Sequence, residues 1–185
     1  MSNNTPSRDD LAYVAAAIRR DRPHDSAPTY FLWALLTPIG FALADLAPMH
    51  AGLFWAVAGP LGGLLSVWLG MRSEHAAGVR NRENGALQGM HWGITALVMV
   101  LFGGYLATLG SGLEQARQAP GFLLLIGFGY ALAGVHLNRG LLPTGLVMIA
   151  GYAAITLLQL PWAWTITGLA CAISLFVSGM RVARG

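Results

Sequence analysis

Five side chains of types that can bind a metal ion are spread over the middle of the chain. Four of them lie in the polar stretch formed by residues 73–92, and the fifth lies further along, beside Asn138. Two or three imidazoles with a carboxylate are a chemically sensible set for zinc or iron. If they met, the chain could be a metal-dependent enzyme at one membrane face. The five candidates are Glu74, His75, Glu83, His91 and His136.

The spacing of these candidates does not support a metal site. The chain contains no HxxxH, HExxH or CxxC pattern, whereas a helix that binds a metal usually places its ligands three or four residues apart. Histidine and arginine at helix ends commonly meet lipid headgroups instead. We therefore expect no bound metal and interpret residues 73–92 as a polar joint between helices.

Other cofactor and nucleophile chemistries also lack a pattern. Bis-histidine haem needs histidines at matched depth, and here only His91 and His136 share a side. The serines lie in no GxSxG sequence. Cys171 lies inside an apolar run, where a reactive thiolate is not expected. The chain has no lysine for a Schiff base. We expect no cofactor, and a non-enzymatic role is favoured.

The composition gives the class of protein. The chain has 185 residues, of which 55% are hydrophobic and 10% charged, whereas soluble domains have about 25% charged residues. It is therefore expected to be an integral membrane protein. The net charge of +3 does not indicate nucleic acid binding, because the arginines are scattered rather than clustered on one face.

Six apolar stretches are long enough to cross a bilayer as helices. They predict an all-α membrane protein, a six-transmembrane-helix bundle that occupies residues 29–185. None contains lysine, arginine or glutamate. The predicted spans are 30–47, 51–71, 89–109, 120–137, 141–160 and 161–180.

Arginine distribution predicts the orientation. Cytoplasmic loops carry an excess of basic residues, and one orientation places every arginine except Arg117 on the same side. Both termini are then cytoplasmic, in a multi-pass protein of an inner membrane. We expect a bacterial source, given the short chain and the arginine-only basic set. The arginines on the cytoplasmic side are Arg8, Arg19, Arg20, Arg22, Arg72, Arg80, Arg82, Arg139, Arg181 and Arg184.

Residues 1–28 form a separate polar segment that contains a predicted amphipathic helix. Ser7 and Asp10 have the spacing of a capping box, and Pro23 would end the helix. One stripe of this helix is apolar, which suits a helix lying on the inner leaflet or against a partner. The stripe consists of Leu11, Val14, Ala15 and Ile18.

Asp45 is the one charged residue within a predicted span. Ionisable residues in membranes usually serve function, so a gate or proton acceptor is one interpretation. Its position near Pro48 and His50 favours the outer interface instead. The polar side chains at mid-depth could line a path for a neutral solute or bond between helices. They are Thr95, Tyr130, Tyr152, Thr156 and Thr167.

Internal similarities suggest three tandem helical hairpins. The sequence Gly-Met-Arg occurs at 70–72 and again at 179–181, and AGVHLNRG at 133–140 resembles SGMRVARG at 178–185. Parallel repeats of this kind are related by an axis along the membrane normal. The alternative is chance, because Ala, Leu and Gly dominate these spans.

Small residues recur at four-residue steps, at Gly59 and Gly63 and at Ala170, Ser174 and Ser178. Such seams let membrane helices approach closely, within the bundle or against a partner. We therefore expect an accessory, regulatory or structural subunit that contacts other membrane helices, in a homo-oligomer or a larger complex. The alternatives are a small transporter or channel for a neutral or apolar solute, and a metal-dependent enzyme at the cytoplasmic face.

Overall fold

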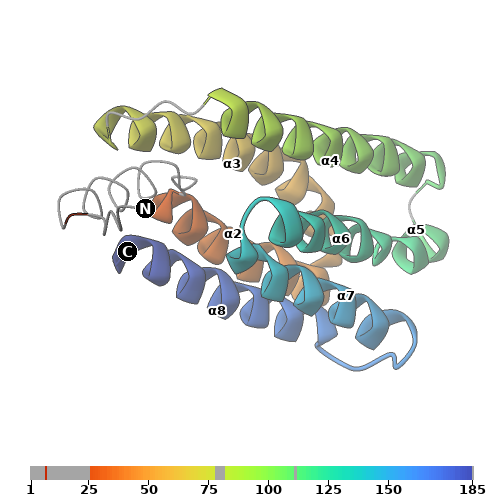
Figure 1. The fold of residues 1–185 in the computed structure, drawn as a ribbon. Helices are drawn as coiled ribbons and strands as arrows, with labels where there is room; N and C mark the ends of the chain where they lie inside the picture. Colours follow the sequence, from red (N-terminus) through yellow and green to blue (C-terminus); the bar gives the residue numbers. More distant parts are fainter. Residues whose placement is uncertain (1–6, 8–25, 78–81, 111, 185) are drawn as a thin grey trace, which may run out of the picture.

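The computed structural model describes Ser7 and residues 26–77, 82–110 and 112–184. All regular secondary structure in these residues is helical, and six helices are long and apolar enough to cross a membrane. The chain is therefore an all-α six-helix bundle, as its composition predicts (Figure 1). The amphipathic helix predicted within residues 1–28 lies outside the described residues, apart from Ser7.

Two of the long helices extend well beyond the apolar windows that predict them. The stretch 73–92 is mostly helical, because α3 continues through it to Ala77 and α4 begins at Arg82. Arginine, glutamate and alanine are good helix formers, so the helices persist where the hydropathy ends. The elements are α2 (Ala27–Leu46), α3 (Pro48–Ala77), α4 (Arg82–Thr108), α5 (Leu113–Gln118), α6 (Gly121–His136), η1 (Arg139–Leu141), α7 (Leu142–Thr156) and α8 (Ala163–Arg184).

The connection between α7 and α8 is longer than expected from the predicted spans 141–160 and 161–180, which follow each other directly. Helix α7 ends at Thr156, and α8 begins only at Ala163. Pro161 cannot continue a helix, and Gln159 and Trp162 have positive φ angles of 49° and 58°. Positive φ is uncommon for residues other than glycine. The chain therefore reverses through an irregular segment, residues 157–162, rather than through a tight turn.

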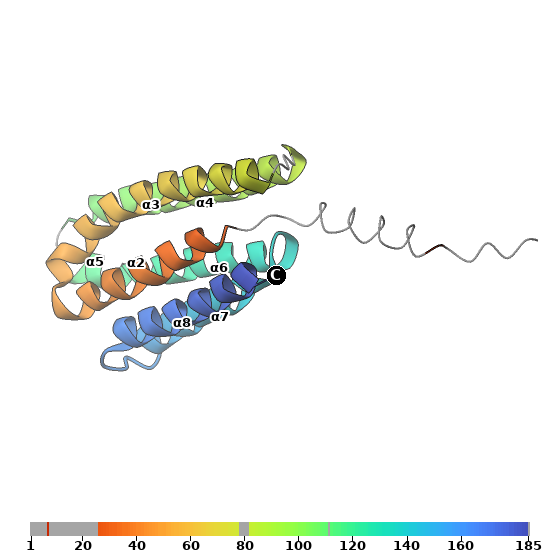
Figure 2. The same ribbon diagram turned by 90° about the vertical axis from the view of Figure 1, so that its left-hand side faces the viewer.

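The long helices follow one another around the bundle in chain order. Helix α2 packs against α3 on one side and most extensively against α8 on the other, α8 packs on α7, α7 on α6, and α6 on α4. The arrangement is an open ring, because α3 and α4 lie on the same side of the bundle but do not pack along one another (Figures 1 and 2).

The beginning of α2 and the end of α8 lie at the same end of the bundle, together with the end of α3 (Figure 2). The link between α6 and α7 also lies there. Six membrane crossings require this arrangement, in which the beginning of α2 and the end of α8 lie at the same end of the bundle. Which compartment that side faces remains a prediction.

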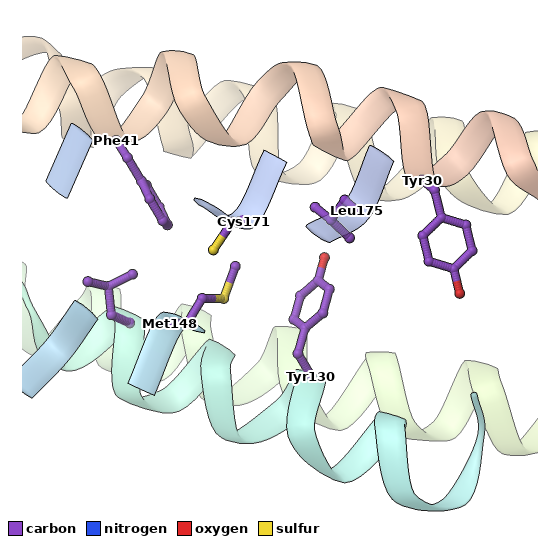
Figure 3. Close-up of a cluster of buried hydrophobic side chains, with 7 residues drawn as sticks. Tyr30, Phe41, Tyr130, Met148, Cys171 and Leu175 are labelled. Carbon is purple, nitrogen blue, oxygen red and sulfur yellow. The ribbon is translucent and has the colours of Figure 1, made fainter. Parts of the chain in front are cut away.

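The core lies between α2, α6, α7 and α8. Tyr130 of α6 points toward Leu175 of α8, and Met148 of α7 lies beside Cys171 (Figure 3). These four side chains are buried, whereas α3 and α4 reach this cluster only with partly buried residues, Trp55 and Trp92 among them. Four helices thus form the packed body, and α3 and α4 flank it.

Each predicted hairpin is a pair of helices in contact: α2 with α3, α4 with α6, and α7 with α8. The three pairs come in the same rotational order around the ring. This agrees with the three-hairpin interpretation, whose superposition about one axis stays a prediction.

Candidate functional site

His91 and His136 meet at the interface between α4 and α6. Their ring centroids are 4.9 Å apart with the rings edge to face. His91 Nε2 lies 3.0 Å from the carbonyl oxygen of Gly129. Because a carbonyl oxygen can only accept a hydrogen bond, Nε2 carries the proton and donates. The His91 ring is therefore held by the α6 backbone.

The same histidine belongs to a series of aromatic contacts. The His91 ring lies 5.0 Å from the Trp92 ring, which in turn lies 5.1 Å from the Tyr130 ring, both edge to face. Edge-to-face pairs at such distances stabilise packing beyond the area they bury. The two histidines thus form one end of a series of ring contacts between α4 and α6.

The other metal-ligand candidates are placed elsewhere or not described. His75 Nδ1 donates to the carbonyl oxygen of Met71, 2.7 Å away, at the exposed end of α3. Glu74 is beside it, half-buried. Glu83 belongs to α4, but its side chain lies outside the description. Among the described residues, no three His, Cys, Asp or Glu side chains form a group that could hold a metal ion. The structure brings together His91 and His136 alone.

Asp45 has a partner far along the chain. Its Oδ2 accepts a hydrogen bond from the backbone N–H of Thr165 at 2.8 Å and another from the Thr165 hydroxyl at 2.7 Å. Thr165 is the third residue of α8, where a capping side chain normally satisfies a free N–H. A carboxylate there also complements the positive end of the helix dipole. Asp45 therefore caps α8 from the end of α2.

The mid-depth threonines bond to their own helices. The hydroxyls of Thr95, Thr156 and Thr167 each donate to a backbone carbonyl four residues earlier, at 2.6 to 2.9 Å. A side-chain hydrogen bond between helices joins Thr144 of α7 to Ser174 of α8 at 2.8 Å. The sequence singles out Ser174 only as a small residue and gives no signal for Thr144.

The two small-residue seams differ in what they face. Ser174 and Ser178 of α8 lie inside the bundle, where Ser178 donates to the carbonyl oxygen of Gly140 at 2.8 Å. A Cβ added to Gly59 or Gly63 of α3 would meet no atom of another described element within 4 Å. Within the described residues, the α8 seam is therefore packed and the α3 seam is not.

An apolar groove of about 550 Å³ lies between α2 and α3. Its lining is formed almost wholly by leucine and other apolar side chains, with His50 as the exception. It has none of the convergent polar groups by which a site fixes a solute. The groove fits lipid chains better than a polar substrate.

In comparisons with known proteins, no family model, no curated protein and no solved structure matches this chain. His75, His91, His136 and Asp45 have structural partners, whereas the exposed surfaces of α3 and α4 do not pack on another described helix.

Proposed function

We propose that this chain is a non-catalytic subunit of a membrane assembly, an accessory or structural component of a bacterial inner membrane. It would act by binding other membrane helices, from further copies or from a partner protein. The binding surface would be the α3–α4 flank, defined as the exposed surfaces of these two helices, including the surfaces that they turn toward each other in the open ring. The proposed orientation puts both termini in the cytoplasm, as the arginine asymmetry favours.

The observation that carries the proposal is the set of empty glycines on these two helices. A lipid-facing position gains nothing from glycine, which costs about 1 kcal/mol relative to alanine in a helix interior. Glycine becomes useful where another helix approaches closely. In the part of the chain that the structure describes, no atom of another element lies within 4 Å of a Cβ added at these positions. They are Gly52, Gly59, Gly63 and Gly70 of α3, and Gly85, Gly89, Gly93 and Gly104 of α4.

Exposure of the flank points the same way. Leu64 of α3 is 68% exposed and Val100 of α4 is 70% exposed, so large apolar side chains stand beside the empty glycines. Lipid alone can cover such side chains, and it is the combination with glycine that favours a helix as neighbour.

Photo-crosslinking in native membranes tests the proposal. A photoreactive residue at Leu64 or Val100 should give discrete protein adducts. The matched control is Ile173 of α8, which is 66% exposed but has no empty glycine face on its helix in the described residues; it should give lipid adducts only. Absence of protein adducts from Leu64 and Val100, together with saturable solute uptake by reconstituted liposomes, would favour the transporter alternative.

A further inference from the structure

The three junctions between successive hairpins are built around matching glycines. The internal similarities align Gly70 of α3, Gly134 of α6 and Gly179 of α8. A Cβ on Gly134 would lie 2.5 Å from the Leu142 backbone of α7, and one on Gly179 would lie 2.9 Å from Phe31 of α2. At both positions the next helix of the ring is seated directly on the glycine. At Gly70 a Cβ would meet no atom of another described element within 4 Å.

A second matched pair repeats the pattern. Gly59 of α3 aligns with Gly168 of α8. A Cβ on Gly168 would lie 2.8 Å from the Cβ of Phe41 in α2, whereas one on Gly59 would meet nothing within 4 Å. Helix α3 thus has counterparts of both α8 glycines that contact α2, and neither counterpart contacts another described helix.

Helix geometry shows which way the empty face of α3 points. Successive residues are rotated by about 100°, so four glycines of α3 fall within a sector of about 40°. On one side of this sector lie Gly62, which is seated against Trp33 of α2, and Trp55, which contacts the core. The sector is therefore turned to one side of the surface by which α3 contacts α2 and the core. This α3 glycine face consists of Gly52, Gly59, Gly63 and Gly70.

Helix α4 presents a corresponding face. Four small exposed residues fall within a sector of about 40° by the same rotation. Gly103 falls in this sector too, but a Cβ there would lie 3.7 Å from Phe122 of α6, so this position is already in contact. Thr95, which is seated against Gly129 of α6, and Trp92, which contacts the core, lie on one side of the sector. Because α3 and α4 run in opposite directions, the same sense of rotation turns the two faces toward each other. This α4 small-residue face consists of Gly85, Gly89, Ala96 and Ala107.

The α6–α7 junction shows what contact between two such faces looks like in this protein. A Cβ on Gly145 would lie 2.6 Å from the carbonyl oxygen of Gly127, and one on Gly127 would lie 3.1 Å from the carbonyl oxygen of Gly145. Here two backbones touch because neither helix has a side chain in the way. Contact at that range gains dispersion energy in a bilayer.

We infer that α3 and α4 close against one another through the α3 glycine face and the α4 small-residue face. Closure completes the ring at its third junction, and the present structure is the open form. The inference rests on the proposed function in one respect: the open form is the one that offers both faces to a partner helix. Closure would then compete with partner binding and regulate it.

Paired cysteines test closure in native membranes. Gly63 and Ala96 lie the same number of residues from the facing ends of α3 and α4, so Gly63→Cys with Ala96→Cys should form a disulfide within one chain. A disulfide needs Cα atoms less than about 7 Å apart, a spacing that the unpacked helices of the open form do not provide. The matched control is Val57→Cys with Leu101→Cys, at similar depth on exposed faces. Both pairs are made in a Cys171→Ala background.

The result expected is an intramolecular disulfide for the first pair and none for the control. Disulfide-linked dimers alone would overturn closure and assign the α3 glycine face to a second copy. No disulfide at all would also overturn it. If the first pair fails to assemble, Gly70→Cys with Gly89→Cys occupies the same two faces nearer the helix ends.

A blocking substitution checks that the glycine face is responsible. Gly63→Leu added to the Gly70→Cys and Gly89→Cys pair should slow disulfide formation at least about tenfold, since a leucine would stand between the faces. An unchanged rate would overturn the inference. The Leu64 and Val100 crosslinks are scored separately, so loss of closure with retained protein adducts leaves the proposed function standing, and the reverse result leaves closure standing.

Discussion

Asp45 at the end of α2 accepts two hydrogen bonds from Thr165 in the first turn of α8, so one carboxylate joins the first and last membrane helices. The helix that receives this cap begins after Trp162, whose backbone has a positive φ. A residue in that conformation is poorly placed to cap the helix by itself. Asp45, the charged residue within the predicted spans, thus has a structural role: it caps α8.

Replacing Asp45 should therefore lower stability. Asp45→Ala removes the cap and should cost about 0.5–2 kcal/mol, whereas Asp45→Asn keeps an accepting oxygen and should cost less. Thr165→Val, which retains the backbone N–H, is the control for loss of the hydroxyl bond alone. Thermal unfolding in detergent measures all three. Unchanged stability with altered solute flux would support the gate interpretation instead.

Two adjacent glycines should respond in opposite ways. A Cβ on Gly62 would lie 3.1 Å from Trp33 and Leu36, and one on Gly63 would meet nothing within 4 Å. Gly62→Leu should therefore destabilise the α2–α3 contact by about 1–3 kcal/mol. Gly63→Leu should leave the open form as stable as before or slightly more stable, because leucine favours the helix, and its cost should be confined to closure against α4. Thermal aggregation of the purified variants compares them, and equal losses would show that Gly63 is already packed.

The His91 and His136 pair should hold helices rather than a metal. His91→Phe keeps the edge-to-face rings but loses the bond to Gly129, which should cost about 1 kcal/mol. His136→Phe keeps a ring against His91 and should cost less. Metal analysis of detergent-purified protein should give well under one zinc or iron per chain. Near-stoichiometric metal that disappears in both variants would contradict this.

Cysteine labelling tests the orientation. With Cys171 buried, a cysteine introduced at Gln115 should react with an impermeant reagent from outside the cell. One introduced at Arg184 should react only after the membrane is permeabilised. The reason is the excess of arginine at the end of the bundle that holds both termini. Labelling of Arg184→Cys in intact cells would reverse the topology.

Helix number and class follow from local composition, because an apolar window of sufficient length has few alternatives to a membrane helix. Helix rotation does not follow from it. Gly62 and Gly63 are neighbours of one type, and only the packed structure shows that Trp33 covers the first and leaves the second bare. Neighbouring residues differ by a rotation of about 100° around the helix axis, so one faces α2 and the next does not. The hydropathy of the sequence does not show which one it is.

Long-range partners are hidden for a related reason. Asp45 and Thr165 lie 120 positions apart, and nothing in either local sequence marks the other. The sequence offers His75, His91 and His136 together as candidates, whereas in the structure His91 contacts His136 and His75 lies at the exposed end of α3. Proximity along the chain is a poor guide here because α4 packs along α6 and not along α3.

The packing of α2 on α8 has a consequence for biogenesis. Nearly every other long helix contacts the one made just before or after it, so those contacts can form as the chain leaves the ribosome. The most extensive helix interface among the described residues instead joins α2 to α8. The face of α2 that carries Tyr30 and Phe41 is therefore covered only after the four intervening long helices have been made, when α8 arrives and is capped by Asp45.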